Sequence, residues 1–207
     1  MNIKAQGLLN AAKWVDEEYG TSTLQEVVRA CSPAVRERYV SAIAINWHPL
    51  EELVEFLGAA DRIIGHGDGR IAEHIGAAGA RANMRGVVVR FAFYVAKPEF
   101  LVQRLANLWR QFNDEGTMRF TEVSEAALKV EVLDLSTPNW LFCCTITGWA
   151  REVMRAVGVA NPTARHVECR ARGQARCIWE VRGARPAGPP DSSGTLPAAS
   201  AIRTPKR

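Results

Sequence analysis

Two cysteines placed symmetrically about a glycine restrict the fold of this chain more than any other feature. Cys169 and Cys177 stand at equal distances in the sequence from Gly173, within segments 165–171 and 176–181 that we interpret as the strands of a hairpin. Directly opposed residues of an antiparallel pair have Cβ atoms about 4.5–5.5 Å apart. The two thiols are therefore predicted to be neighbours, close enough to share one metal ion.

Cys143 and His166 complete a candidate set of metal ligands. Three cysteines and one histidine are a recognised closed, tetrahedral set for structural zinc. His166 lies three residues before Cys169, and an odd separation in a regular strand places side chains on opposite faces. A shared ion therefore requires a bulge between them. Spacing alone leaves two alternatives open: a reversible Cys169–Cys177 disulfide, or a core role for Cys143 and Cys144 with His166 on the surface.

The remaining sequence changes its hydrophobic period from helical to extended. Helical spacing predicts helices over 2–18, 24–30, 33–45, 50–58, 70–81, 99–114 and 138–157. The helix over 70–81 is rich in glycine and alanine, which favours close packing against a neighbour. Segments 118–123 and 128–133 predict an antiparallel strand pair. The order indicates an α+β fold in which helices pack on a small antiparallel sheet that ends in the C-terminal hairpin, which the candidate zinc would clasp.

Composition indicates one globular domain over residues 1–182, with 47% hydrophobic and 23% charged residues in the whole chain. Residues 183–207 are rich in Pro, Gly, Ser and Ala, so we expect a disordered tail. The sequence shows neither a signal-peptide pattern nor an apolar stretch that could cross a membrane, which predicts a cytoplasmic protein.

The net charge of +4 does not indicate nucleic-acid binding. From residue 183 onward, four basic residues stand against one acidic residue, which leaves a body of about +1. A nearly neutral body has no electrostatic footprint for DNA. We also find no nucleophile–base pair, carboxylate pair or nucleotide-binding loop, so no catalytic residues are predicted.

The segment from Trp140 to Val181 resembles the end of the ligand-sensing domains of phenol- and xylene-responsive, sigma-54-dependent bacterial activators. The matching positions are Cys143, Gly148, Trp149, Ala150, Gly158, His166, Cys169 and Cys177. Those domains belong to the vinyl-reductase-type (4-vinyl reductase) superfamily, which is related in fold to haem-NO-binding sensors and TRAPP-type trafficking subunits. In the phenol-responsive members, three cysteines and a glutamate hold zinc.

The resemblance implies a zinc site formed by Cys143, Cys169 and Cys177, with His166 in place of the family's glutamate. Imidazole is an ordinary zinc ligand, so this replacement keeps the chemistry and removes one negative charge. Glu168 and Cys144 lie close enough in the sequence to serve as alternative ligands.

The resemblance also implies a stand-alone sensory or regulatory domain that binds a small apolar or aromatic molecule beside the zinc. Since the activators' ATPase and DNA-binding domains have no counterpart in this sequence, we expect it to signal to a separate protein partner. Sensors of this type pair through N-terminal helices, so the resemblance also implies a homodimer, with the helical segment 1–45 as the candidate dimerisation region. The candidate pocket residues are Phe93, Tyr94 and Trp109. For Trp109 a core position is the favoured interpretation, because it lies on the apolar face of its predicted helix.

Two further functions remain open from the sequence. One is an accessory protein or enzyme of pigment biosynthesis, which would need a tetrapyrrole or redox cofactor. The other is a haem-based gas sensor, which would need a proximal histidine. His48, His66 and His74 are the candidates, and His74 is favoured because it lies in a predicted helix.

Overall fold

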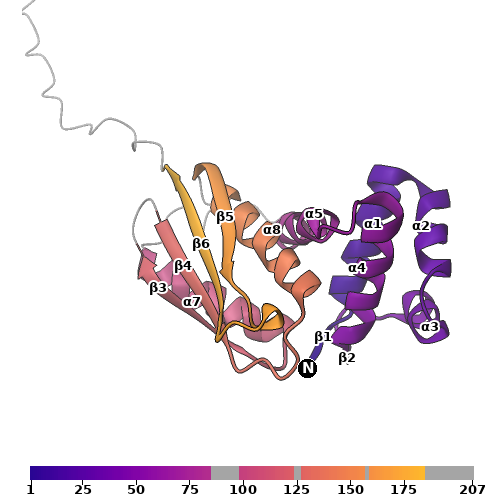
Figure 1. The fold of residues 1–207 in the computed structure, drawn as a ribbon, viewed down its shortest axis with the longest axis horizontal. Coiled ribbons are helices and arrows are strands. Elements are labelled where there is room, and N and C mark those ends of the chain that lie inside the picture. The colour runs from indigo at the N-terminus through magenta and orange to yellow at the C-terminus, as the bar shows by residue number, and fades with distance from the viewer. Residues whose placement is uncertain (85–97, 124–126, 157–158, 185–207) are drawn as a thin grey trace, which may run out of the picture.

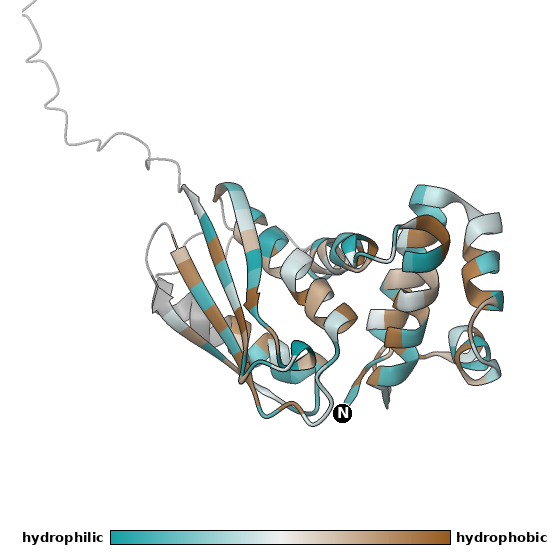
Figure 2. Ribbon diagram, in the orientation of Figure 1, coloured by the Kyte–Doolittle hydropathy of each residue, from teal (hydrophilic) through white to brown (hydrophobic). Residues whose placement is uncertain are grey.

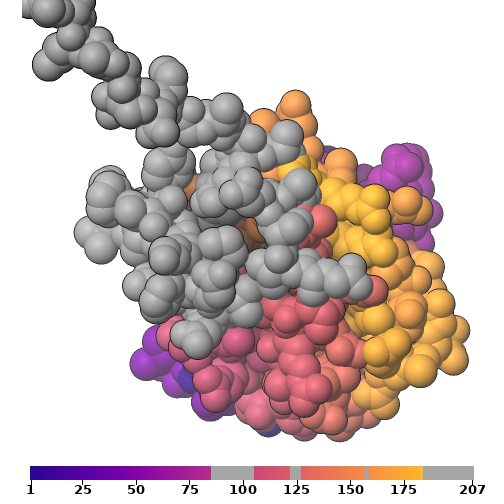
Figure 3. Space-filling view, turned by 90° about the vertical axis from the view of Figure 1, so that its left-hand side faces the viewer, coloured from indigo at the N-terminus to yellow at the C-terminus, as the bar shows by residue number. Residues whose placement is uncertain are grey.

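The computed structural model describes residues 1–84, 98–123, 127–156 and 159–184. Helices α1–α4 lie on one side of the molecule and a four-stranded sheet lies on the other, with α5 and α8 between them (Figure 1). Strand residues form the surface on the side away from α1–α4 (Figure 3). The α+β class predicted from the sequence is confirmed.

The N-terminal region consists of helices α1 (Gln6–Tyr19), α2 (Thr21–Arg29), α3 (Pro33–Ser41) and α4 (Leu50–Ile64). The strands β1 (Asn2–Lys4) and β2 (Trp47–Pro49) pair in an antiparallel manner beside them. The buried core here includes Val15, Val27 and Phe56.

The helices predicted over 2–18 and 33–45 are each too long. The first helix begins at Gln6 because the residues before it pair with β2. The third helix ends at Ser41 because the carbonyls of Ala44 and Asn46 accept hydrogen bonds from the backbone of Gln6 and Ala5, at 3.0 and 2.9 Å. These long-range pairings override the local helical pattern.

Helices α5 (Arg70–Asn83) and α8 (Trp140–Ala156) approach each other until their backbones touch. A Cβ atom at Gly76 would lie 2.0 Å from the carbonyl oxygen of Thr145. A Cβ atom at Gly148 would lie 1.8 Å from the carbonyl oxygen of Glu73. Both separations are shorter than any tolerable contact, so each helix requires glycine where it meets the other. The close packing predicted for the glycine-rich helix is present.

The sheet has the strand order β3-β4-β6-β5, and its neighbouring strands are antiparallel. Its strands are β3 (Thr117–Val123), β4 (Ala127–Leu133), β5 (Ala160–Glu168) and β6 (Cys177–Ala184). Apolar and polar residues alternate along β4 and β6 (Figure 2), as expected for strands with one face in the core. The strand pair and the hairpin predicted from the sequence are both confirmed.

Helix α7 (Pro98–Phe112) and α8 cover the inner face of the sheet. Leu105 and Trp109 of α7 are buried together with Met118 and Val130 of the strands. Within the described residues, no helix has both the length and the apolar character needed to span a membrane.

The α5–α8 contact predicts that Gly76→Ala destabilises the protein, whereas Gly79→Ala on the same helix does not. At Gly76 the new methyl group would force the backbones apart, and such overpacking costs about 1–3 kcal/mol. At Gly79 the nearest atom to a new Cβ is Asn10 Nδ2 at 4.0 Å, so the gain in helix propensity of about 0.5–1 kcal/mol remains. Urea unfolding measures both changes, and equal unfolding free energies for the two variants would contradict this assignment.

Candidate metal centre and ligand cavity

The structure brings Cys143, His166, Cys169 and Cys177 together, with one ligand atom from each lying within 4.8 Å of the others. The Sγ atoms of Cys143 and Cys177 are 3.9 Å apart. A tetrahedron with Zn–S bonds of about 2.3 Å has edges of about 3.8 Å, whereas a disulfide requires about 2.05 Å. The spacing therefore fits ligands around one metal ion, and all five cysteines are free thiols.

Local irregularities in the hairpin place His166 and Cys169 on the same side. The pairing between β5 and β6 shifts its register between His166 and Glu168, which supplies the bulge that the odd spacing required. After β5 the chain makes a short 3-10 turn (Arg170–Arg172) and passes through Gly173 at φ 84°. The carbonyl oxygen of Cys169 accepts hydrogen bonds from the backbone of Arg172 and Gln174, which fixes this corner.

Cys143 is held at the beginning of α8. The side-chain oxygen of Asn139 accepts hydrogen bonds from the backbone of Leu141 and Phe142, at 2.9 and 3.3 Å. This arrangement satisfies donors that the first turn of a helix leaves free. The sulfur of Cys143, which is fully buried, consequently faces the hairpin from a fixed helix start.

His166 is oriented by an aromatic neighbour on the central strand. Its ring stacks on Trp179, with centroids 4.3 Å apart and planes 6° from parallel. Trp179 Nε1 in turn donates a hydrogen bond of 3.0 Å to Thr147 Oγ1 of α8. The Nε2 atom of His166 is buried and has no hydrogen-bond partner among the described residues. A buried nitrogen without a partner is costly, and coordination to a metal would satisfy it.

The thiols of the cluster differ in their tendency to ionise. The hydrogen bond from the Cys143 thiol lowers the pKa of Cys177 to about 4, and His166 and the Arg170 backbone N–H act in the same direction. That same hydrogen bond and burial raise the pKa of Cys143. Burial also raises the pKa of Cys169. Of the three cysteines in the cluster, Cys177 is therefore the one whose thiolate form is most favoured before a cation binds.

The two alternative ligands lie outside the cluster. The sulfur of Cys144 packs against the glycine turn before α5, where a Cβ atom at Gly69 would lie 2.7 Å from it. Burial raises the pKa of Cys144 to about 12. Glu168 forms an ion pair with Arg176, with 3.9 Å between Oε2 and Nε.

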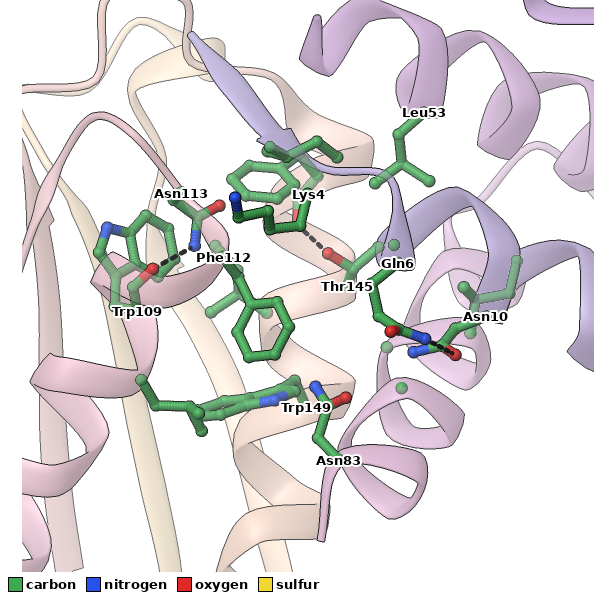
Figure 4. A pocket seen from close by; sticks show the side chains of 18 of the residues that line it. Lys4, Gln6, Asn10, Leu53, Asn83, Trp109, Phe112, Asn113, Thr145 and Trp149 are labelled. Atoms are coloured by element: carbon green, nitrogen blue, oxygen red, sulfur yellow. Dashed lines mark hydrogen bonds between the residues drawn. The ribbon is translucent and has the colours of Figure 1, made fainter. Parts of the chain in front are cut away.

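A cavity of about 150 Å³ lies between α1, α5, α7 and α8, close to the beginning of β3 (Figure 4). Trp109 is one of the lining residues. Its ring is held in place by hydrogen bonds from its Nε1 atom to the carbonyl oxygens of Glu115 and Gly116. Phe93 and Tyr94, the other predicted pocket residues, lie outside the described residues.

Sequence reasoning missed most of the polar lining of this cavity. The side chains of Gln6, Asn10, Asn83 and Asn113 reach it, together with Trp149 of α8 (Figure 4). The available signal was the glycine spacing on α5, because Gly76 and Gly79 lie on one helix face together with Asn83. Both glycines line the cavity.

The candidate haem-ligating histidines lie elsewhere. His74, the favoured one, is exposed on α5 and stacks on Trp14 at a centroid distance of 6.0 Å. His66 is exposed in the glycine turn. His48 lies in β2, where burial and the charge of Arg38 lower its pKa. All four histidines and all five cysteines fall within the described residues, and none of them lines the cavity.

No protein-family model and no curated protein matches this chain. Solved structures do match. An unliganded Fe(II) H-NOX protein variant from K. algicida has a TM-score of 0.66 at 8% identity, covering 87% of this chain and 96% of that one. The chain has the H-NOX fold.

Two other structures agree with this assignment. An H-NOX protein from S. oneidensis gives a TM-score of 0.64 at 14% identity and covers 90% of this chain and 98% of its own. An oxygen-binding H-NOX domain related to soluble guanylate cyclases gives 0.60 at 10% identity and covers 87% and 95%. Identities this low define the H-NOX fold alone. The resemblance of the C-terminal segment to vinyl-reductase-type domains stays a prediction, which these structures neither support nor contradict.

The ionisation of the cluster predicts that metal affinity falls as the pH falls. Cys143 and Cys169 have raised pKa values, so each must release a proton when a metal binds, whereas Cys177 is already a thiolate at neutral pH. Titration of the metal-free protein with Zn²⁺ in weakly buffered solution at pH 7 should release one proton from each of these two thiols. Affinity that stays constant between pH 6 and 8 would contradict this expectation.

Proposed function

We propose that this chain is a stand-alone sensor domain that binds a small molecule in the cavity and holds a structural zinc ion at Cys143, His166, Cys169 and Cys177. The observation that carries this proposal is the position of α8. The helix contributes Cys143 to the metal cluster, and its residues Thr145 and Trp149 line the cavity. The H-NOX fold supports a sensory role, because one solved member is described as an oxygen-binding domain.

A zinc ion at this position would be structural. Four protein ligands leave no open coordination position for water or substrate. The ion would join the hairpin of β5 and β6 to the beginning of α8, and the binding free energy would add to the free energy of folding.

Haem is the second candidate, and the solved H-NOX structures favour it, since two of them concern haem redox potential and haem distortion. Haem iron takes His, Cys, Met or Tyr as protein ligands. Among the described residues that line the cavity, Met118 is the single side chain of these types. A cavity of about 150 Å³ engineered into another protein holds benzene, and a haem macrocycle is several times larger. The described residues therefore do not fit a histidine-ligated haem.

The expected homodimer and the separate protein partner stay predictions. The segment from the end of α3 to the start of β2 carries four exposed apolar side chains, Val40, Ile43, Ile45 and Trp47, and they support an interaction surface in the N-terminal region. Light scattering on the purified protein tests the dimer.

We expect the purified protein to contain one zinc ion per chain and to be colourless. Mass spectrometry under native conditions gives the metal content, and an absorption spectrum after addition of haemin shows whether haem is ligated. A stoichiometric Soret band that is lost in Met118→Leu and kept in His74→Ala would replace this proposal with the haem-based one.

Cys169→Ser should remove the zinc and lower Tm strongly, whereas Cys144→Ser should keep the zinc and lower Tm less, by the cost of one buried hydroxyl. Binding at a free ligand concentration one thousand times the Kd stabilises a protein by about 4 kcal/mol, so the expected loss in Tm is about 8–16 °C. Calorimetry with parallel metal analysis makes the comparison. Equal Tm values for the two variants would show that the cluster does not stabilise the fold.

A further inference from the structure

Both bare backbone and aromatic rings line the cavity. Gly7 of α1 and Gly79 of α5 are lining residues without a side chain, and the rings of Phe112 and Trp149 project into the cavity in Figure 4. A Cβ atom at Gly79 would meet nothing nearer than Asn10 Nδ2 at 4.0 Å. The space above this glycine is therefore open, and aromatic rings among the lining residues favour a planar ring as the ligand.

Side-chain amides from α1 and α5 supply polar groups to the lining of the cavity. Gln6 Nε2 donates a hydrogen bond of 2.9 Å to Asn10 Oδ1, which leaves the Asn10 NH₂ group and the Gln6 carbonyl oxygen for another partner. The amide of Asn83 forms no hydrogen bond with the described part of the chain, and in Figure 4 it lies on the same side as Asn10. Amide donors and acceptors from α1 and α5 thus line the same cavity.

The lining carries almost no charge that a ligand could meet. Lys4 is its one ionisable residue among the described ones. The Lys4 ammonium group donates a hydrogen bond of 2.7 Å to the carbonyl oxygen of Ile45 and lies 3.7 Å from the centre of the Trp47 ring. Because this cation already has partners, a charged ligand would be left without compensation in an apolar cavity.

We propose that the cavity binds a neutral, planar ring of about the size of benzene that carries an amide-like edge, as in a lactam or pyridone. The ring lies between the glycine backbone and the faces of Phe112 and Trp149. Its adjacent N–H and C=O groups exchange hydrogen bonds with Asn10 and Asn83. This inference rests on the proposed small-molecule-binding function and specifies the ligand class for the same cavity.

The test compares two probes of similar size by calorimetric titration of the full chain. The first probe, 2-pyridone, has the amide edge, and the second, toluene, lacks it. Asn83→Leu should weaken 2-pyridone about tenfold, because one hydrogen-bonding partner is lost, and should leave toluene within about twofold. Asn107→Leu is the matched control, since Asn107 is exposed on α7 and does not line the cavity.

Gly79→Leu tests whether the cavity itself is the site. The leucine side chain would fill the open space, so binding of both probes should be lost while the protein stays folded, which thermal unfolding verifies. Gly79→Ala is the smaller step and should weaken both probes less.

The possible outcomes separate the ligand class from the proposed function. If both probes are insensitive to Asn83→Leu and both are lost in Gly79→Leu, the amide-edge assignment is overturned and small-molecule binding in the cavity stands. If neither probe binds, the inference is overturned. If haemin then binds with a Soret band, the proposed function is overturned as well.

Discussion

The contact between the backbones of α5 and α8 determines where the other parts of the molecule lie. Gly76 and Gly148 each face a carbonyl oxygen of the opposite helix, so neither position tolerates a side chain without separating the helices. Through this contact the N-terminal helices, which pack on α5, are joined to the sheet, which packs on α8. The metal cluster and the cavity both include residues of α8.

Helix α8 presents different chemistry on each of its faces. Cys143 points to the hairpin, Thr147 accepts the hydrogen bond from Trp179, and Trp149 lines the cavity. A shift of this helix would therefore move its residues in the cluster and its residues in the cavity together, because side chains on a rigid helix move as a unit. Helix α8 is thus a direct physical connection between the cavity and the sheet.

The hairpin, its bulge and the proximity of Cys169 and Cys177 were predictable because their constraints are local. Spacing alone left the four-residue metal set open against a disulfide or a core role, and the resemblance to zinc-holding sensor domains favoured it. Symmetric spacing about Gly173 places Cys169 and Cys177 together, and the odd interval from His166 already demands an irregular strand. The strands β1 and β2 were not predictable, since their pairing joins segments far apart in the sequence. The positions of the Asn10 and Asn83 amides in one cavity were not predictable either, because no local pattern shows that α1 and α5 direct these side chains into it.

Cys177 begins β6, the strand that lies between β4 and β5. Side chains alternate with a period of two along a strand, so a slip by one residue would turn Trp179 and Val181 out of the core and carry Cys177 away from Cys143. An ion held by the cluster would consequently distinguish the correct strand alignment from its nearest competitors. During folding, metal coordination would favour the native register of β6 over registers shifted by one residue, in addition to stabilising the folded protein.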